Sequence, residues 1–182
     1  SQQLYDLYFK KFTSHYNAAQ TALSLAGKAY SQEDWAQAVH YYGIVVENFT
    51  NSTHYASALQ YLSICNGKLG NQPEQEKWLR AFSKVAKKPL DRTSSMLALA
   101  FMQQKRGVAD FVAACETNET DRAAIQKAAT ISVIKAIQDF RGVAKEATAA
   151  LEDKSVAKED RAKFENQREQ SLYLEGDSWQ RL

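Results

Sequence analysis

A repeated spacing of apolar residues is the feature of this sequence that most restricts its fold. Four residues in stretches with helical periodicity serve as anchors: Leu25, Leu62, Leu99 and Ile134. They are separated by 37, 37 and 35 residues. The same separations recur among four candidate turn residues: Glu33, Gly70, Gly107 and Gly142. A repeat period of about 20–50 residues is typical of one supersecondary unit stacked along the chain, so we predict an all-α superhelix of antiparallel helix pairs.

The clearest helix pair lies in residues 22–49. Its predicted first helix has small apolar residues and a leucine at helical spacing: Ala22, Leu25, Ala26 and Ala29. Its second helix has mostly larger apolar residues around one alanine: Trp35, Ala38, Tyr42, Val45 and Val46. Apolar residues three and four positions apart form one face of a helix. We therefore interpret these residues as packing residues, with a tight turn at Glu33 and Asp34.

The other helix pairs follow from the same spacing. We predict turns at Gly70, at Arg106 and Gly107, and at Arg141 and Gly142, because glycine tolerates the backbone conformation of a tight turn. Pro73 suits the first turn of a helix, and Pro89 ends the helix before it. The prediction is one domain, 1–182, with these segments: an N-terminal aromatic helix 1–17, repeats 18–53, 54–89, 90–119 and 120–153, and a C-terminal segment 154–182.

The segments at the two ends of the chain each allow two structural interpretations. Residues 4–16 contain seven large apolar side chains: Leu4, Tyr5, Leu7, Tyr8, Phe9, Phe12 and Tyr16. They form either a helix that covers the first repeat or an exposed contact surface. Residues 154–182 are rich in charge and form either a capping helix, as a helical array requires, or a degenerate fifth repeat that turns at Gly176 and Asp177.

The pattern resembles the tetratricopeptide repeat superfamily over about residues 18–153. Residues 27–71 are most similar to repeats of bacterial envelope proteins of that superfamily. Matching positions in this stretch include Asp34, Trp35, Ala38, Tyr42, Phe49, Ser52, Ala58, Leu59 and Leu62. Gln75 and Val112 stand where the pattern has alanine, and Glu116 stands where it has an aromatic residue. The later repeats therefore depart from the pattern.

The resemblance implies a concave groove lined by the first helix of each pair. By the spacing of the family, groove-facing positions lie two residues before each anchor and two, five and six after it. The candidate binding residues among them are Leu23, Tyr30, Gln60, Ile64, Lys68, Leu97, Phe101, Gln104, Lys105 and Phe140. Apolar side chains predominate, which suits a helix or an extended segment with aliphatic side chains.

The sequence gives no reason to expect catalysis. His15, His40 and His54 lie far apart and lack the spacing of a metal site. Nucleophile, phosphate-binding and dinucleotide motifs are absent from the sequence. Its net charge is +2 with mixed signs, which does not favour nucleic acid as a partner. We therefore expect no enzymatic activity and no cofactor or metal.

The sequence thus predicts an interaction protein with a protein or peptide partner and no direct membrane insertion, since no apolar run reaches the roughly 20 residues that cross a bilayer. The alternative is a structural module whose groove and N-terminal helix mediate homo-oligomerisation. The groove is open to a ligand, occupied by the chain's own N-terminal helix, or part of an oligomer interface. Localisation stays open, and the resemblance favours a bacterial envelope, periplasmic or membrane-anchored, over the cytoplasm.

Overall fold

The computed structural model describes residues 2–12, 17–117 and 119–182, and in these ranges it contains α-helices and connecting loops without a strand. Within them the chain forms two compact units, Ser1–Val85 and Ala86–Leu182, which are described separately (unit 1 and unit 2). Between residues 18 and 85 in unit 1 and between residues 89 and 180 in unit 2, helices that are neighbours along the chain pack against one another. This confirms the predicted fold class, an all-α array of packed helices. Residues 13–16, including Tyr16 of the predicted aromatic helix, lie outside the described residues.

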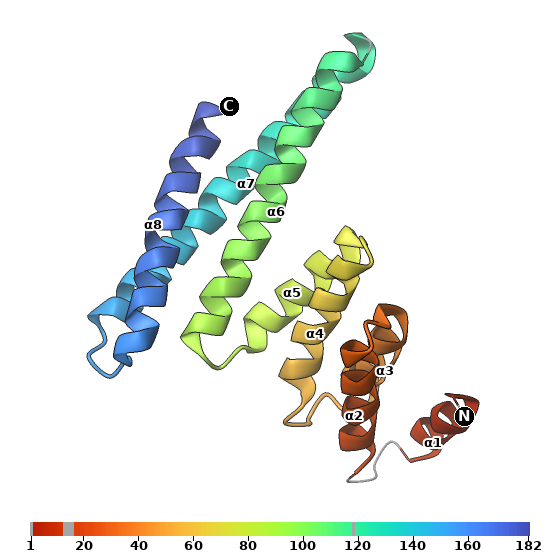
Figure 1. Cartoon of the computed structure of the whole chain (residues 1–182). Helices are drawn as coiled ribbons and strands as arrows, with labels where there is room; N and C mark the ends of the chain where they lie inside the picture. The colour runs from red at the N-terminus through yellow and green to blue at the C-terminus, as the bar shows by residue number, and fades with distance from the viewer. Residues whose placement is uncertain (1, 13–16, 118) are drawn as a thin grey trace. The chain divides into compact units, whose positions relative to one another are not determined.

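Unit 1 consists of short helices (Figure 1). Their bounds are α1 Gln2–Lys11, α2 Ala18–Ser31, α3 Trp35–Asn48, α4 Tyr55–Lys68 and α5 Gln72–Val85. Helix α2 packs on α3, α3 on α4, and α4 on α5. The predicted packing residues Ala38 and Tyr42 are buried, and Trp35 is half-buried. Small residues on α2 let α3 approach closely: Ala18, Ala19, Ala22, Ala26 and Ala29 are all buried.

The turns of unit 1 repeat with the spacing predicted from the sequence. After α2, the Asp34 N–H donates to the Ala29 carbonyl at 3.0 Å, and after α4 the Asn71 N–H donates to the Asn66 carbonyl at 2.9 Å. Glu33 and Gly70 both have positive φ, 57° and 73°. This is the Schellman ending of a helix, in which one left-handed residue closes the last turn. The two turns are thus the same structure, 37 residues apart.

Unit 2 is built differently from the prediction. Its helices are α6 Pro89–Glu116, α7 Glu119–Glu152 and α8 Lys158–Gln180. The predicted turns at Arg106 and Gly107 and at Arg141 and Gly142 are wrong, because α6 and α7 continue through these positions. Helix α8 likewise continues through Gly176, so residues 154–182 hold one helix rather than a helix pair.

Gly107 has a packing role instead of a turn role. Helices α6 and α7 run antiparallel, as shown by the Arg92–Glu146 ion pair at 2.8 Å near one end. A Cβ atom placed on Gly107 would lie 2.6 Å from Val133 Cγ2 and 3.0 Å from the Ala129 carbonyl oxygen. Glycine is therefore required here for the close approach of two helices, which explains why it occurs inside α6.

Polar side chains join α8 to α6. Thr93 Oγ1 donates to Gln167 Oε1 at 2.7 Å, and Gln167 Nε2 donates to Ser94 Oγ at 2.7 Å. Gln104 Nε2 donates to Asp177 Oδ2 and to Ser178 Oγ, both at 2.9 Å. Each bond joins residues 73 or 74 positions apart, so α8 runs parallel to α6 in a fixed register.

Candidate functional site

A groove between α6 and α8 of unit 2 contains two of the predicted binding residues, Leu97 and Phe101. Its volume is about 370 Å³. The apolar lining consists of Leu97, Ala98, Phe101 and Leu174, and the polar lining consists of Ser94, Asn166, Gln167 and Gln170. The Phe101 side chain is 49% exposed, so a large aromatic ring is left in contact with water at the edge of a cavity. This combination is characteristic of a site for an apolar group.

The floor of this groove is a small apolar core. Ala100, Ala136 and Phe140 are fully buried together, and Leu97 and Leu174 pack against them. The rims of the groove are fixed by the polar bonds between α6 and α8. Leu97 and Leu174 are therefore held from both sides, which makes the groove a rigid surface rather than an adaptable one.

Other predicted residues of unit 2 lie outside the groove surface. Phe140 is 0% exposed and belongs to the core, so it offers no face to a partner. Gln104 is buried, and its side-chain amide donates hydrogen bonds to Asp177 and Ser178. These two placements correct the sequence analysis, which set both side chains on a binding surface. Lys105 is exposed.

In unit 1 the predicted residues lie on α2 and α4. Leu23, Tyr30 and Ile64 are half-buried, and Gln60 and Lys68 are exposed. The Tyr30 ring contacts the rings of Trp35 and Tyr61, with centroids 5.2 and 5.1 Å apart.

Lys68 Nζ lies over Trp35, 5.8 Å from its centroid. The structure thus brings Tyr30 and Lys68 together around one indole. It also gives Tyr30 a packing role that the sequence analysis did not include.

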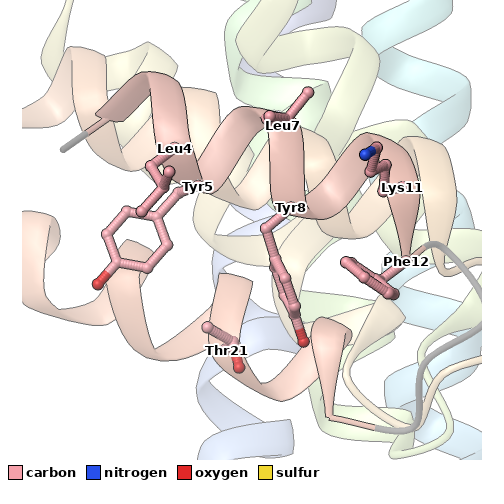
Figure 2. Close-up of a pocket in the computed structure, with 7 residues that line it drawn as sticks. All are labelled: Leu4, Tyr5, Leu7, Tyr8, Lys11, Phe12 and Thr21. Atoms are coloured by element: carbon pink, nitrogen blue, oxygen red, sulfur yellow. The ribbon is translucent and has the colours of Figure 1, made fainter.

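Helix α1 carries a second apolar groove (Figure 2). Its volume is about 360 Å³. Its lining consists of Leu4, Tyr5, Leu7, Tyr8 and Lys11 of α1, Phe12 directly after α1, and Thr21 of α2. Leu4 is 72% exposed, whereas Phe9 is buried. Asp6 Oδ1 lies 2.8 Å from His40 Nε2 of α3. One face of α1 therefore packs on the first helix pair while another faces solvent.

The α8 side of the unit 2 groove was missed from the sequence. Five buried or half-buried residues follow one another along α8 at steps of three and four: Phe164, Gln167, Ser171, Leu174 and Ser178. The spacing is helical, but three of the five are polar. A pattern search that weighs only apolar residues does not detect such a face.

Two buried groups in unit 1 make its stability sensitive to alkaline pH. Burial raises the pKa of the Cys65 thiol to about 11 from an ordinary value of 9.0. Burial also raises the pKa of Tyr42, and the neighbouring Tyr61 raises it further. Both groups lose their protons more readily in the unfolded chain. The free energy of unfolding therefore falls as the pH rises above the unfolded-state values.

We expect the thermal midpoint of the protein to fall between about pH 8 and about pH 10.5, where Cys65 ionises in the unfolded state but not in the folded one. The variant Cys65→Ala should lose less of its own midpoint over the same interval, because the thiol no longer contributes. Circular dichroism melts of both proteins at the two pH values give this comparison. An equal loss in both would show that the Cys65 thiol does not carry the effect.

Comparison with known proteins found no matching family model, curated protein or solved structure. Over its described residues, the chain has no cluster of three or more histidine, cysteine, aspartate or glutamate side chains that suits a metal ion. Its helices, in the same ranges, lack the length and apolar character needed to cross a membrane.

Proposed function

We propose that this protein is a non-enzymatic scaffold that binds an apolar segment of a partner protein in the α6–α8 groove of unit 2. The observation that carries the proposal is the half-exposed ring of Phe101 beside a groove with a rigid apolar floor. Covering such a ring removes apolar surface from water, and aromatic side chains contribute strongly to protein interfaces.

The lining of the groove indicates the kind of segment that fits. Leu97, Phe101 and Leu174 favour aliphatic or aromatic side chains. Asn166 and Gln170 present amides that both donate and accept hydrogen bonds, so they suit the backbone of an extended peptide or the polar edge of a helix. The lining contains no charged side chain. The part of the ligand that enters the groove is therefore expected to be uncharged.

The helix pairs of unit 1 support the wider proposal of a tetratricopeptide-like scaffold. Two matching Schellman turns, 37 residues apart, and a face with Tyr30, Trp35 and Lys68 are features of a repeat array that presents side chains to a partner. Fold alone does not establish function. The test is therefore directed at the groove.

Peptide display against the full chain, followed by isothermal titration of an enriched peptide, tests the groove. Phe101→Asp should raise the dissociation constant of the peptide at least about tenfold, which corresponds to about 1.4 kcal/mol. Tyr173→Asp is the matched control, because Tyr173 is 73% exposed on α8 and is absent from the groove lining. A peptide that binds wild type and Phe101→Asp equally would place the binding site elsewhere.

The exposed face of α1 favours a second candidate, in which this helix mediates homo-oligomerisation. Leu4 and Leu7 on α1 and Phe12 directly after it are exposed, and such a patch often marks a contact surface. Light scattering of the full chain and of a chain without residues 1–12 tests this. An oligomer that persists without α1 would count against the second candidate.

A further inference from the structure

The paired helices of unit 2 extend beyond the helix that covers them. Helix α8 ends at Gln180, and its register with α6 places this end beside residues 106 and 107. Helices α6 and α7 continue past this point to their connecting loop (Figure 1). Gly107 lies against Ala129 and Val133 of α7, so residues 108–116 and 121–131 are here called the hairpin extension. Along the described residues of this extension α6 and α7 pack only on each other, whereas in the rest of unit 2 α8 packs on them as well.

The hairpin extension exposes large apolar side chains on both helices. Val112 is 59% exposed and Ile131 is 57% exposed, and Ile134, just beyond the extension, is also exposed. Val112 lies eleven residues, or about three turns, after Phe101 and continues its face of α6.

Arg141 lies seven residues after Ile134 and pairs with Glu175 of α8. Residues seven apart lie on nearly the same side of a helix. Ile134 therefore lies on the side of α7 that α8 covers farther along that helix. Val112 likewise lies on the side of α6 that faces the groove farther along.

The exposed charges along and beside the extension indicate the kind of partner that suits this face. Glu116 is exposed at the end near the loop, Lys127 is exposed midway along the α7 part, and Lys105 and Lys135 are exposed just beyond the other end. Lys105, Val112 and Glu116 are separated by seven and four residues, and Lys127, Ile131 and Lys135 by four each. Each apolar residue is thus flanked by charge on the same helical face.

We propose that the hairpin extensions of two copies of this chain pack antiparallel to form a four-helix bundle. A two-fold axis near residue 110 of α6 places Glu116 of one copy beside Lys105 and Lys135 of the other. The same operation places Ile131 of one copy against Val112 of the other. A two-fold interface uses one self-complementary patch twice, and helical hairpins with apolar faces form such bundles. A parallel pairing would instead set Glu116 against Glu116.

Light scattering and sedimentation over a concentration series test the association. Wild type should dimerise, and Ile131→Lys should raise the dimer dissociation constant at least about tenfold, because a charge then enters the apolar contact. Tyr173→Lys is the matched control at an exposed position outside the hairpin extension and should behave as wild type. Glu116→Lys and Lys105→Glu should each weaken the dimer, and the double variant should regain most of the affinity.

Cross-linking tests the antiparallel direction. Cys115 is exposed and Cys65 is buried, so a short bis-maleimide reports on Cys115 alone. The variant Lys105→Cys should give a covalent dimer that joins Cys115 of one copy to the introduced thiol of the other, since positions 105 and 115 of opposite copies lie at the same height. Within one chain these positions are separated by ten residues, or about 15 Å of helix, too far for the reagent. Wild type should cross-link poorly.

Three outcomes would overturn the proposal. The first is a chain that stays monomeric at every concentration. The second is a dimer that is lost without residues 1–12 but unaffected by Ile131→Lys and Glu116→Lys. The third is efficient cross-linking of wild type through Cys115 alone, which indicates parallel packing. Peptide binding in the α6–α8 groove is measured separately through Phe101→Asp, so each proposal can fail without the other.

Discussion

Replacing Phe140 with alanine should lower the free energy of unfolding by about 3–5 kcal/mol, as for other fully buried aromatic residues. The ring is 0% exposed and lies between Ala100 and Ala136. Ala100 and Ala136 have no side chain that can turn into the space left behind, and Leu97 and Leu174 would have to leave the groove lining to fill it, so most of the cavity would remain. Urea denaturation followed by circular dichroism measures the loss, and hydrogen exchange assigns it to unit 2.

Phe101→Ala is the control for this experiment. Both phenylalanines were predicted from the sequence to face a binding groove, but Phe101 is half-exposed. Its removal should cost less than about 1 kcal/mol, because substitutions of exposed residues have small effects. A loss as large as that of Phe140→Ala would contradict the surface position of Phe101 and remove the basis of the proposed groove.

The variant Gly107→Ala should lower the free energy of unfolding by about 1–3 kcal/mol through overpacking. The new methyl group would lie 2.6 Å from Val133 Cγ2 and 3.0 Å from the Ala129 carbonyl oxygen. Since the second contact is backbone, α6 and α7 must move apart. The better helix propensity of alanine, about 1 kcal/mol, offsets only part of this cost.

Gly142→Ala provides the comparison, because the same substitution is made inside the partner helix. Its methyl group would meet only Met96 Cε, at 3.3 Å, and the end of a methionine side chain moves readily. We expect unchanged or slightly higher stability for this variant. Equal destabilisation of both variants in thermal melts would contradict the packing role of Gly107.

The sequence spacing predicted unit 1 well and unit 2 poorly, for a physical reason. At Glu33 and Gly70 the spacing coincides with real turns, since both residues have left-handed φ. At Gly107 and Gly142 the same spacing occurs without a turn. Glycine serves both tight turns and close helix contacts, and a sequence does not state which. Only the position of Val133, on another helix, shows that Gly107 serves a contact.

The candidate site was predicted in part. Leu97 and Phe101 were identified as binding residues because the family resemblance places groove-facing residues two before and two after the anchor Leu99. The structure places both in one groove. Phe140 was assigned to the same surface on the assumption of a fourth helix pair. Its burial results from α8, whose Leu174 packs against the same core. Three of the five residues on this face of α8 are polar, so its apolar signal was too weak to reveal the contact.

The hydrogen bonds between α6 and α8 have a consequence for how a ligand would be received. If α8 slipped by one turn, Gln167 would lose Thr93 and Ser94 at the same time as Gln104 lost Asp177 and Ser178. Each buried polar group left unpaired costs about 1–3 kcal/mol, so intermediate registers are unfavourable. The groove is therefore preorganised: a ligand would meet walls already in place, and little of its binding energy would be spent on ordering the receptor.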